Sequence, residues 1–173
     1  MTALTQSLTD NPRLDRWVGF ESDRTVRIAT GKVELGQGVL TALVQIAAEE
    51  LDVPPARIRL LSGVTAQSPN EGYTAGSRSI EESGGSIRLV CAEVRSLFLE
   101  HIAGVLDCPR GELAIKDGAV LRNDVPTGFD YWSLNEKIDL ARPATPGRCC
   151  RSRDYHRARR FQPGRPDRQD RVR

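Results

Sequence analysis

Two glycines and a glutamine stand between a strand-like and a helix-like stretch of the sequence. Residues 32–35, before Gly36, Gln37 and Gly38, alternate in polarity as a half-buried strand does. Residues 39–51, after them, carry apolar side chains at helical spacing. Only glycine enters positive φ without a steric penalty, so the chain can turn sharply here. A helix that begins at such a turn exposes unpaired amides and the positive end of its dipole, and both favour an anion such as phosphate.

A plain tight turn is the alternative interpretation of this segment. It lacks the third glycine of a dinucleotide-binding fingerprint. It also lacks the G-K-[ST] sequence of a P-loop, because Lys32 is followed by Val33.

A second glycine-bearing loop, residues 69–79, runs into the next helical pattern. It ends in Ala75, Gly76, Ser77, Arg78 and Ser79. Hydroxyls and amides at a helix start can bind phosphate oxygens, and an arginine can pair with them through two hydrogen bonds. In the alternative interpretation, Ser77 or Ser79 simply caps the helix, since Ser79 and Glu82 have the spacing of a capping box.

The two loops are separated by one helix and one strand, so they can converge on a single anionic ligand. Glu71 lies in the second loop as an isolated carboxylate. We expect it to face solvent and not to act as a general base, because such a role requires partners that orient it.

The predicted elements that position these loops alternate between strand and helix. A hairpin over residues 17–30, the helix 39–51, a strand over 58–61, a helix from Ser77 or Ser79 to about Leu106 and a hairpin over 112–122 follow one another. Pro54 and Pro55 end the first helix, because proline lacks the amide that the next turn needs. This order predicts an α+β fold of mixed α/β layers.

Composition fits a folded domain. The chain has 173 residues, of which 39% are hydrophobic and 28% charged. The sequence contains no apolar run of the roughly 20 residues that a membrane span needs, and residues 1–12 show no secretory signal. We therefore expect a cytoplasmic location. The four cysteines form no C-x-x-C pair and no histidine lies at ligand spacing from them, so no metal site is expected within the chain. Cys91 is expected to be a small buried hydrophobic residue.

Charge divides the chain into two unlike parts. Residues 143–173 contain 10 Arg and 3 Asp, a net charge of +7, whereas residues 1–142 carry 15 basic and 20 acidic residues, a net charge of −5. We expect residues 1–10 to be a flexible N-terminus, residues 11–142 to form the domain and residues 143–173 to be a disordered Arg- and Pro-rich tail. A shift of reading frame in a GC-rich gene explains such a tail composition.

At the two loops the sequence resembles a known family. The first loop and helix are similar to the G-x-x-E-x-G-Q-G-x-x-T-x-x-x-Q-x-A segment of the xanthine dehydrogenase and aldehyde oxidase family, and residues 69–84 to that family's second molybdopterin-contacting segment. The start of the domain, with Trp17, and the later segment around Trp132 are most similar to the large subunits of isoquinoline 1-oxidoreductase and nicotinate dehydrogenase. The resemblance covers residues 11–142 and predicts a partial molybdopterin-binding domain.

The resemblance implies a cofactor and partners. Gly36, Gln37 and Gly38 then contact a molybdopterin-type molybdenum cofactor. Ala75, Gly76, Ser77, Arg78 and Ser79 line its other side. Family members hydroxylate N-heteroaromatic compounds or aldehydes with oxygen from water, while the protein positions the cofactor that carries the chemistry. Their partners are an iron–sulfur small subunit and, in some, a cytochrome-type electron acceptor.

The chain also departs from the family. The catalytic glutamate of the family lies in a region that this sequence does not contain, so we expect a fragment of a large subunit that is inactive alone. Two alternatives remain open. One is a non-enzymatic anion- or nucleic-acid-binding module that uses the basic tail, although the tail has few aromatic residues and matches no nucleic-acid module. The other is a non-functional gene remnant whose exposed apolar faces promote aggregation.

Overall fold

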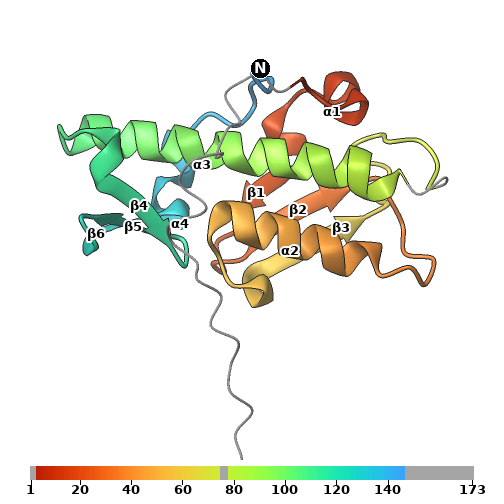
Figure 1. Ribbon diagram of the computed structural model, residues 1–173, viewed down its shortest axis with the longest axis horizontal. Coiled ribbons are helices and arrows are strands. Elements are labelled where there is room, and N and C mark those ends of the chain that lie inside the picture. Colours follow the sequence, from red (N-terminus) through yellow and green to blue (C-terminus); the bar gives the residue numbers. More distant parts are fainter. Residues whose placement is uncertain (1–2, 75–77, 147–173) are drawn as a thin grey trace, which may run out of the picture.

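The longest element of the fold is the helix α3. In the computed structural model, which describes residues 3–74 and 78–146, α3 (Gly85–Val105) runs along the molecule with α2 (Val39–Leu51) beside it (Figure 1). Behind them lies a three-stranded sheet of β1 (Val18–Phe20), β2 (Val26–Thr30) and β3 (Ile58–Ser62). The expected α+β fold is confirmed.

The sheet combines an antiparallel hairpin with a parallel crossover. β1 pairs antiparallel with β2, and β2 pairs parallel with β3. Parallel neighbours need a long connection, which here contains α2. Leu43, Ala47 and Leu51 form the buried face of α2, as their helical spacing predicts. The helix ends at Leu51, just before the two prolines, and Asp52 takes the left-handed conformation that closes it.

The predicted strand over residues 32–35 is wrong. β2 ends at Thr30, and residues 32–35 form a loop without strand pairing. Leu35 keeps 70% of its surface exposed, so it does not occupy the inward face that the alternation predicts. The physical reason lies at Gly31, whose amide donates to the Glu71 side chain and not to a neighbouring strand.

The second predicted helix begins with a wider turn. Residues Ile80–Gly84 form a π-helix, η3, and continue directly into α3. The predicted capping box is also wrong, because Ser79 has helical backbone angles and makes no side-chain capping hydrogen bond. Insertions of π geometry are frequent at functional sites, and this one adjoins the second glycine loop.

A second sheet follows α3 and shares its core. The predicted hairpin consists of β4 (Leu113–Lys116) and β5 (Ala119–Arg122), and β6 (Val125–Asp130) extends it. The short helix α4 (Tyr131–Leu134) then brings Tyr131 against Phe20 and Phe98, at ring-centroid distances of 4.8 and 4.9 Å. These aromatic contacts join the second sheet to the main body.

Described residues on both sides of the predicted domain, 11–142, pack against it. Where a flexible N-terminus is expected, α1 (Gln6–Asp10) is capped by Thr5 and buries Leu8 completely. The segment after residue 142 also packs against the domain, because Pro143 bridges to Arg13 and Ala144 is 8% exposed. Residues 147–173, including Cys149 and Cys150, lie outside the described residues.

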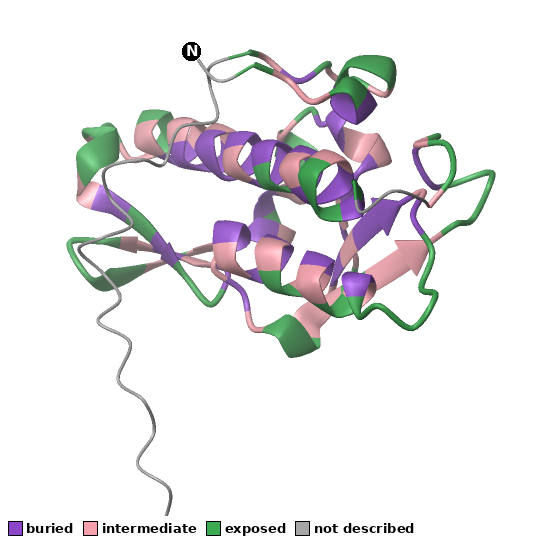
Figure 2. Ribbon diagram, turned by 45° about the vertical axis from the view of Figure 1, so that its right-hand side comes forward, coloured by how far each residue is buried: buried purple, intermediate pink, exposed green. Residues whose placement is uncertain are grey.

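Buried residues form stripes along α2 and α3, whereas the loops at the end where α2 begins are exposed (Figure 2). Cys91 lies within the buried stripe of α3, as expected. Within residues 3–74 and 78–146, no helix is long and apolar enough to cross a membrane. The same residues contain no group of three or more His, Cys, Asp or Glu side chains arranged to hold a metal ion.

Candidate functional site

The two glycine loops lie side by side at one end of the molecule, where α2 and η3 begin (Figure 1). The backbone amide of Val33 donates to the Thr74 side-chain oxygen at 3.0 Å, which links the first loop directly to the second. The ammonium of Lys32 also reaches the second loop. The structure therefore brings together the two segments that were predicted to converge.

The first loop turns through two glycines in the left-handed region. Gly36 has φ of 92° and Gly38, which directly precedes α2, has φ of 71°. A Cβ added at either residue meets no atom within 4 Å. Backbone conformation, and not crowding within the chain, is therefore why glycine suits these positions, and their open faces let a ligand approach the main chain.

The amides at the start of α2 already have an acceptor. The Glu34 carboxylate accepts hydrogen bonds from the amides of Gly36 at 2.9 Å, Gly38 at 2.8 Å and Leu40 at 3.2 Å. These bonds, above all the one from Gly38, lower the pKa of Glu34. For Gly38 and Leu40 the expectation of unpaired amides is wrong, because the nearby Glu34 carboxylate accepts from both.

Gln37 is exposed and folds back on its own loop. Its side-chain oxygen accepts from the amide of Leu35, and its nitrogen donates to the carbonyl of Val33 at 3.2 Å. Exposed hydrogen bonds of this kind exchange readily with those to a ligand, because the net stability of each is small. The side-chain amide of Gln37 is therefore available to a ligand both as a hydrogen-bond donor and as an acceptor.

The second loop is described up to Thr74 and again from Arg78. Ala75, Gly76 and Ser77, which were predicted to contact the cofactor, lie outside the described residues. Arg78 is 66% exposed and donates to Glu82 at 2.7 Å. This bond lowers the pKa of Glu82. Ser79 is buried at 9% exposure, so it is the less accessible of the two described candidates in this loop.

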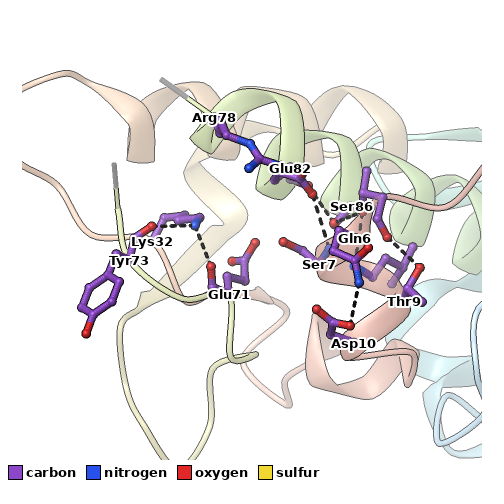
Figure 3. A network of polar contacts seen from close by, with 12 residues as sticks. Gln6, Ser7, Thr9, Asp10, Lys32, Glu71, Tyr73, Arg78, Glu82 and Ser86 are labelled. Carbon is purple, nitrogen blue, oxygen red and sulfur yellow. Dashed lines mark hydrogen bonds and ion pairs between the residues drawn. The ribbon is translucent and has the colours of Figure 1, made fainter. Parts of the chain in front are cut away.

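Glu71 and Lys32 are site residues that sequence reasoning missed. Glu71 does not simply face solvent, because its Oε2 atom accepts from Thr30 Oγ1 at 2.8 Å, from the Gly31 amide at 2.8 Å and from Ser83 Oγ at 3.1 Å. Lys32 is 5% exposed, and its ammonium donates to the carbonyls of Glu71 at 2.8 Å and Tyr73 at 3.0 Å (Figure 3). A lysine in an apparent strand gives no sequence signal for such a buried role.

Glu34 was also missed, although its position held a signal. It lies a few residues before the first amides of α2. A carboxylate in that position is placed to accept from helix-start amides and to interact with the helix dipole.

A cleft of about 780 Å³ opens between α1, the second loop and η3 (Figure 3). Lys32 and Arg78 bring positive charge to it, and Asp10, Glu71 and Glu82 bring negative charge. Among the predicted site residues that the structure describes, Arg78 lines this cleft, whereas Gln37 belongs to the neighbouring exposed loop. The candidate site thus has a mixed-charge cleft on one side and the glutamine loop on the other.

Comparison with known proteins places this geometry in a family. The family described as the molybdopterin cofactor-binding domain matches residues 3–157. The match extends past residue 142, the expected end of family-like sequence. A nicotinate dehydrogenase subunit of Pseudomonas putida is 34% identical over 111 residues, which are 64% of this chain and 9% of that protein. Aldehyde oxidase 4 of Rattus norvegicus is 35% identical over 69 residues, which are 40% of this chain and 5% of that protein.

Solved structures share the fold. Quinoline 2-oxidoreductase from Pseudomonas putida 86 superposes with a TM-score of 0.56 at 25% identity, covering 68% of this chain and 15% of that one. CO dehydrogenase from Oligotropha carboxidovorans superposes with a TM-score of 0.59 at 22% identity, covering 75% of this chain and 18% of that one. The chain therefore spans less than a fifth of each of these relatives. The resemblance to the xanthine dehydrogenase and aldehyde oxidase family is confirmed, and the chain belongs to the molybdopterin cofactor-binding domain family.

Proposed function

We propose that this chain supplies one wall of the molybdopterin pocket in a molybdenum hydroxylase large subunit. The observation that carries the proposal is the direct joining of the two glycine loops, through the hydrogen bond from Val33 to Thr74. Both segments that resemble cofactor-contacting segments thereby face the same end of the molecule. Family membership supports the choice of ligand.

The residues present fit the pterin part of the cofactor. A pterin ring edge carries both donors and acceptors, and the Gln37 amide offers one of each. The open faces of Gly36 and Gly38 leave room for a ring to approach the backbone. The phosphate fits less well at the α2 amides, because Glu34 occupies them. The exposed guanidinium of Arg78 is the better partner for it.

The bound cofactor supplies the redox chemistry, the hydroxylation of an N-heteroaromatic compound or an aldehyde with oxygen from water. This chain holds and orients the pterin, and we assign no catalytic residue to it. Because it spans a small share of its relatives, we propose that it works as part of a longer large subunit. The partners proposed with it are an iron–sulfur small subunit and a cytochrome-type electron acceptor.

Cofactor retention tests this function. The full chain is incubated with molybdopterin cofactor released from a donor enzyme and then desalted. Bound molybdenum is measured by mass spectrometry and bound pterin by fluorescence after oxidation. We expect retention by the native chain and a loss of about tenfold in Q37A, the equivalent of one to two hydrogen bonds. Gln67, an exposed glutamine outside the first loop, provides the matched control Q67A, which should retain cofactor normally.

Two results would contradict the proposal. Retention no greater than that of an unrelated protein would show that the chain alone holds no cofactor. Equal retention by Q37A and the native chain would remove Gln37 from the site. The loaded chain should also fail to hydroxylate heteroaromatic compounds, and measurable turnover would overturn the proposed dependence on a longer subunit.

A further inference from the structure

We propose that Glu71 and Lys32 are positioning residues that hold the two cofactor loops at a fixed separation. This inference rests on the proposed function, because the two loops whose separation it explains are the ones proposed to contact the cofactor. Neither residue needs to touch the ligand, because each acts through the backbone of the loops.

The Glu71 side chain links the second loop to two other parts of the chain, residues 30–31 and the π-helix. Its Oε2 atom accepts from Thr30 at the end of β2, from the Gly31 amide at the start of the first loop, and from Ser83 in the π-helix. The hydroxyl oxygens of Thr30 and Ser83 also lie 2.8 Å apart, and both residues are fully buried. Because two hydroxyl protons serve the two contacts to Glu71 and the contact between the hydroxyls, at most two of these three are hydrogen bonds at one time. One side chain thereby connects the second loop to the end of β2, the start of the first loop and the π-helix.

The Lys32 ammonium holds the second loop through two of its main-chain carbonyls. It donates to the carbonyls of Glu71 and Tyr73, which flank Gly72 in the left-handed conformation (Figure 3). Ser62 Oγ in turn donates to the Lys32 carbonyl at 2.7 Å, which ties the lysine backbone to β3. A lysine is rarely this buried without partners, and here its partners are main-chain atoms of the loop that it holds.

The backbones themselves touch beside these side chains. A Cβ added to Gly31 would lie 2.5 Å from the Pro69 carbonyl oxygen and 3.1 Å from the Glu71 amide nitrogen. Contacts closer than 3.0 Å require atoms to shift, and both of these are backbone atoms. The loops are therefore in direct contact at Gly31, and beyond it the bond from Val33 to Thr74 continues the junction.

If Glu71 and Lys32 only stabilised the domain, their loss would affect hydrogen exchange differently than if they position the loops. Loss of general stability opens the whole domain, whereas loss of a positioning contact frees the loops and leaves the core closed. Amide hydrogen exchange separates the two, because the Gly31 and Val33 amides belong to the junction, and those of Leu43 and Ala47 belong to the buried face of α2.

The experiment compares E71A and E71Q of the full chain with E81A. Glu81 is an exposed carboxylate in the π-helix that contains Ser83. In E71A we expect exchange at Gly31 and Val33 to accelerate about tenfold, the equivalent of one hydrogen bond, with Leu43 and Ala47 unchanged. Glutamine keeps an oxygen for the three donors, so E71Q should return exchange toward the native rate. E81A should match the native chain.

Cofactor retention is measured on the same proteins and should fall in E71A while recovering in E71Q. If E71A does not fold, T74V removes the acceptor of the Val33 amide alone and should accelerate exchange at that residue. Unchanged exchange at Gly31 and Val33, or equal acceleration at Leu43 and Ala47, would overturn the inference. If exchange accelerates locally in E71A but the native chain retains no cofactor, the loop junction is supported and the proposed function is refuted.

Discussion

The Glu34 carboxylate lies 2.8 Å from the Gly38 amide nitrogen, at the start of α2. It therefore acts as the cap of that helix from within the glycine loop. The same contact determines what the helix start can bind, because the amides of Gly36, Gly38 and Leu40 share one internal acceptor.

We predict that E34A destabilises the first turn of α2. The amides of Gly36 and Gly38 lose their acceptor, so their hydrogen exchange should accelerate, and the thermal midpoint should fall. E49A, which changes an acidic residue of the same helix away from its start, should leave the exchange of these amides unchanged. Native-like exchange in E34A would show that the carboxylate does not cap the helix.

The Glu34 contact should also depend on pH. Its amide hydrogen bonds lower its pKa in the folded chain. Its contribution to stability is therefore present at pH values above the ordinary glutamate range and is lost as pH falls through the lowered pKa. We expect the stability difference between the native chain and E34A to shrink as pH falls from 5 to about 3. A difference that is constant over this range in urea titrations would contradict the assignment.

Gly38 offers a test of backbone conformation. In G38A the residue keeps open space around its Cβ but must adopt φ of 71°, which costs a non-glycine residue about 1–2 kcal/mol. Urea unfolding should report that loss. Gly104 is an exposed position of α3 where an added Cβ meets no atom within 4 Å, so G104A should instead stabilise the chain by about 0.5 kcal/mol. The opposite signs distinguish local strain from a general intolerance of added methyl groups.

Tyr131 joins the second sheet to α2 through its hydroxyl. The phenol donates to the Leu51 carbonyl at 3.0 Å, and the side chain is fully buried. Y131F should lower the free energy of unfolding by about 1–2 kcal/mol, because the carbonyl loses a buried donor. Tyr73 is 95% exposed, so Y73F should change stability by less than about 0.5 kcal/mol. Equal effects would argue against a role for the hydroxyl.

The segment after residue 142 contributes to stability through Glu93. This carboxylate is fully buried on α3 and accepts from the Thr145 amide at 2.8 Å. A chain that ends at residue 142 loses that donor, whereas one that ends at residue 146 keeps it. We expect the shorter chain to be less stable by about 1–3 kcal/mol. Identical urea midpoints would show that residues 143–146 do not stabilise the domain.

Local pattern accounts for much of the fold. The helical spacing of Leu43, Ala47 and Leu51 predicts α2, because a helix with one apolar stripe has one way to bury it. The two glycines predict the turn before it, since positive φ is a property of the residue itself. The sequence also identified the cofactor family, because its two glycine loops stand at recognisable spacing.

The contacts of Lys32 and Glu71 were decided by tertiary structure. Lys32 looked like the polar residue of a strand, and Glu71 like a solvated loop carboxylate. Their hydrogen-bond partners lie in distant segments of the sequence. A pattern over a few neighbouring residues cannot reveal such contacts. Glu34 differs from these two residues, because it contacts amides only two to six residues away, and this local signal was missed. Long-range hydrogen bonding follows from how the elements pack, and that packing is a property of the whole chain.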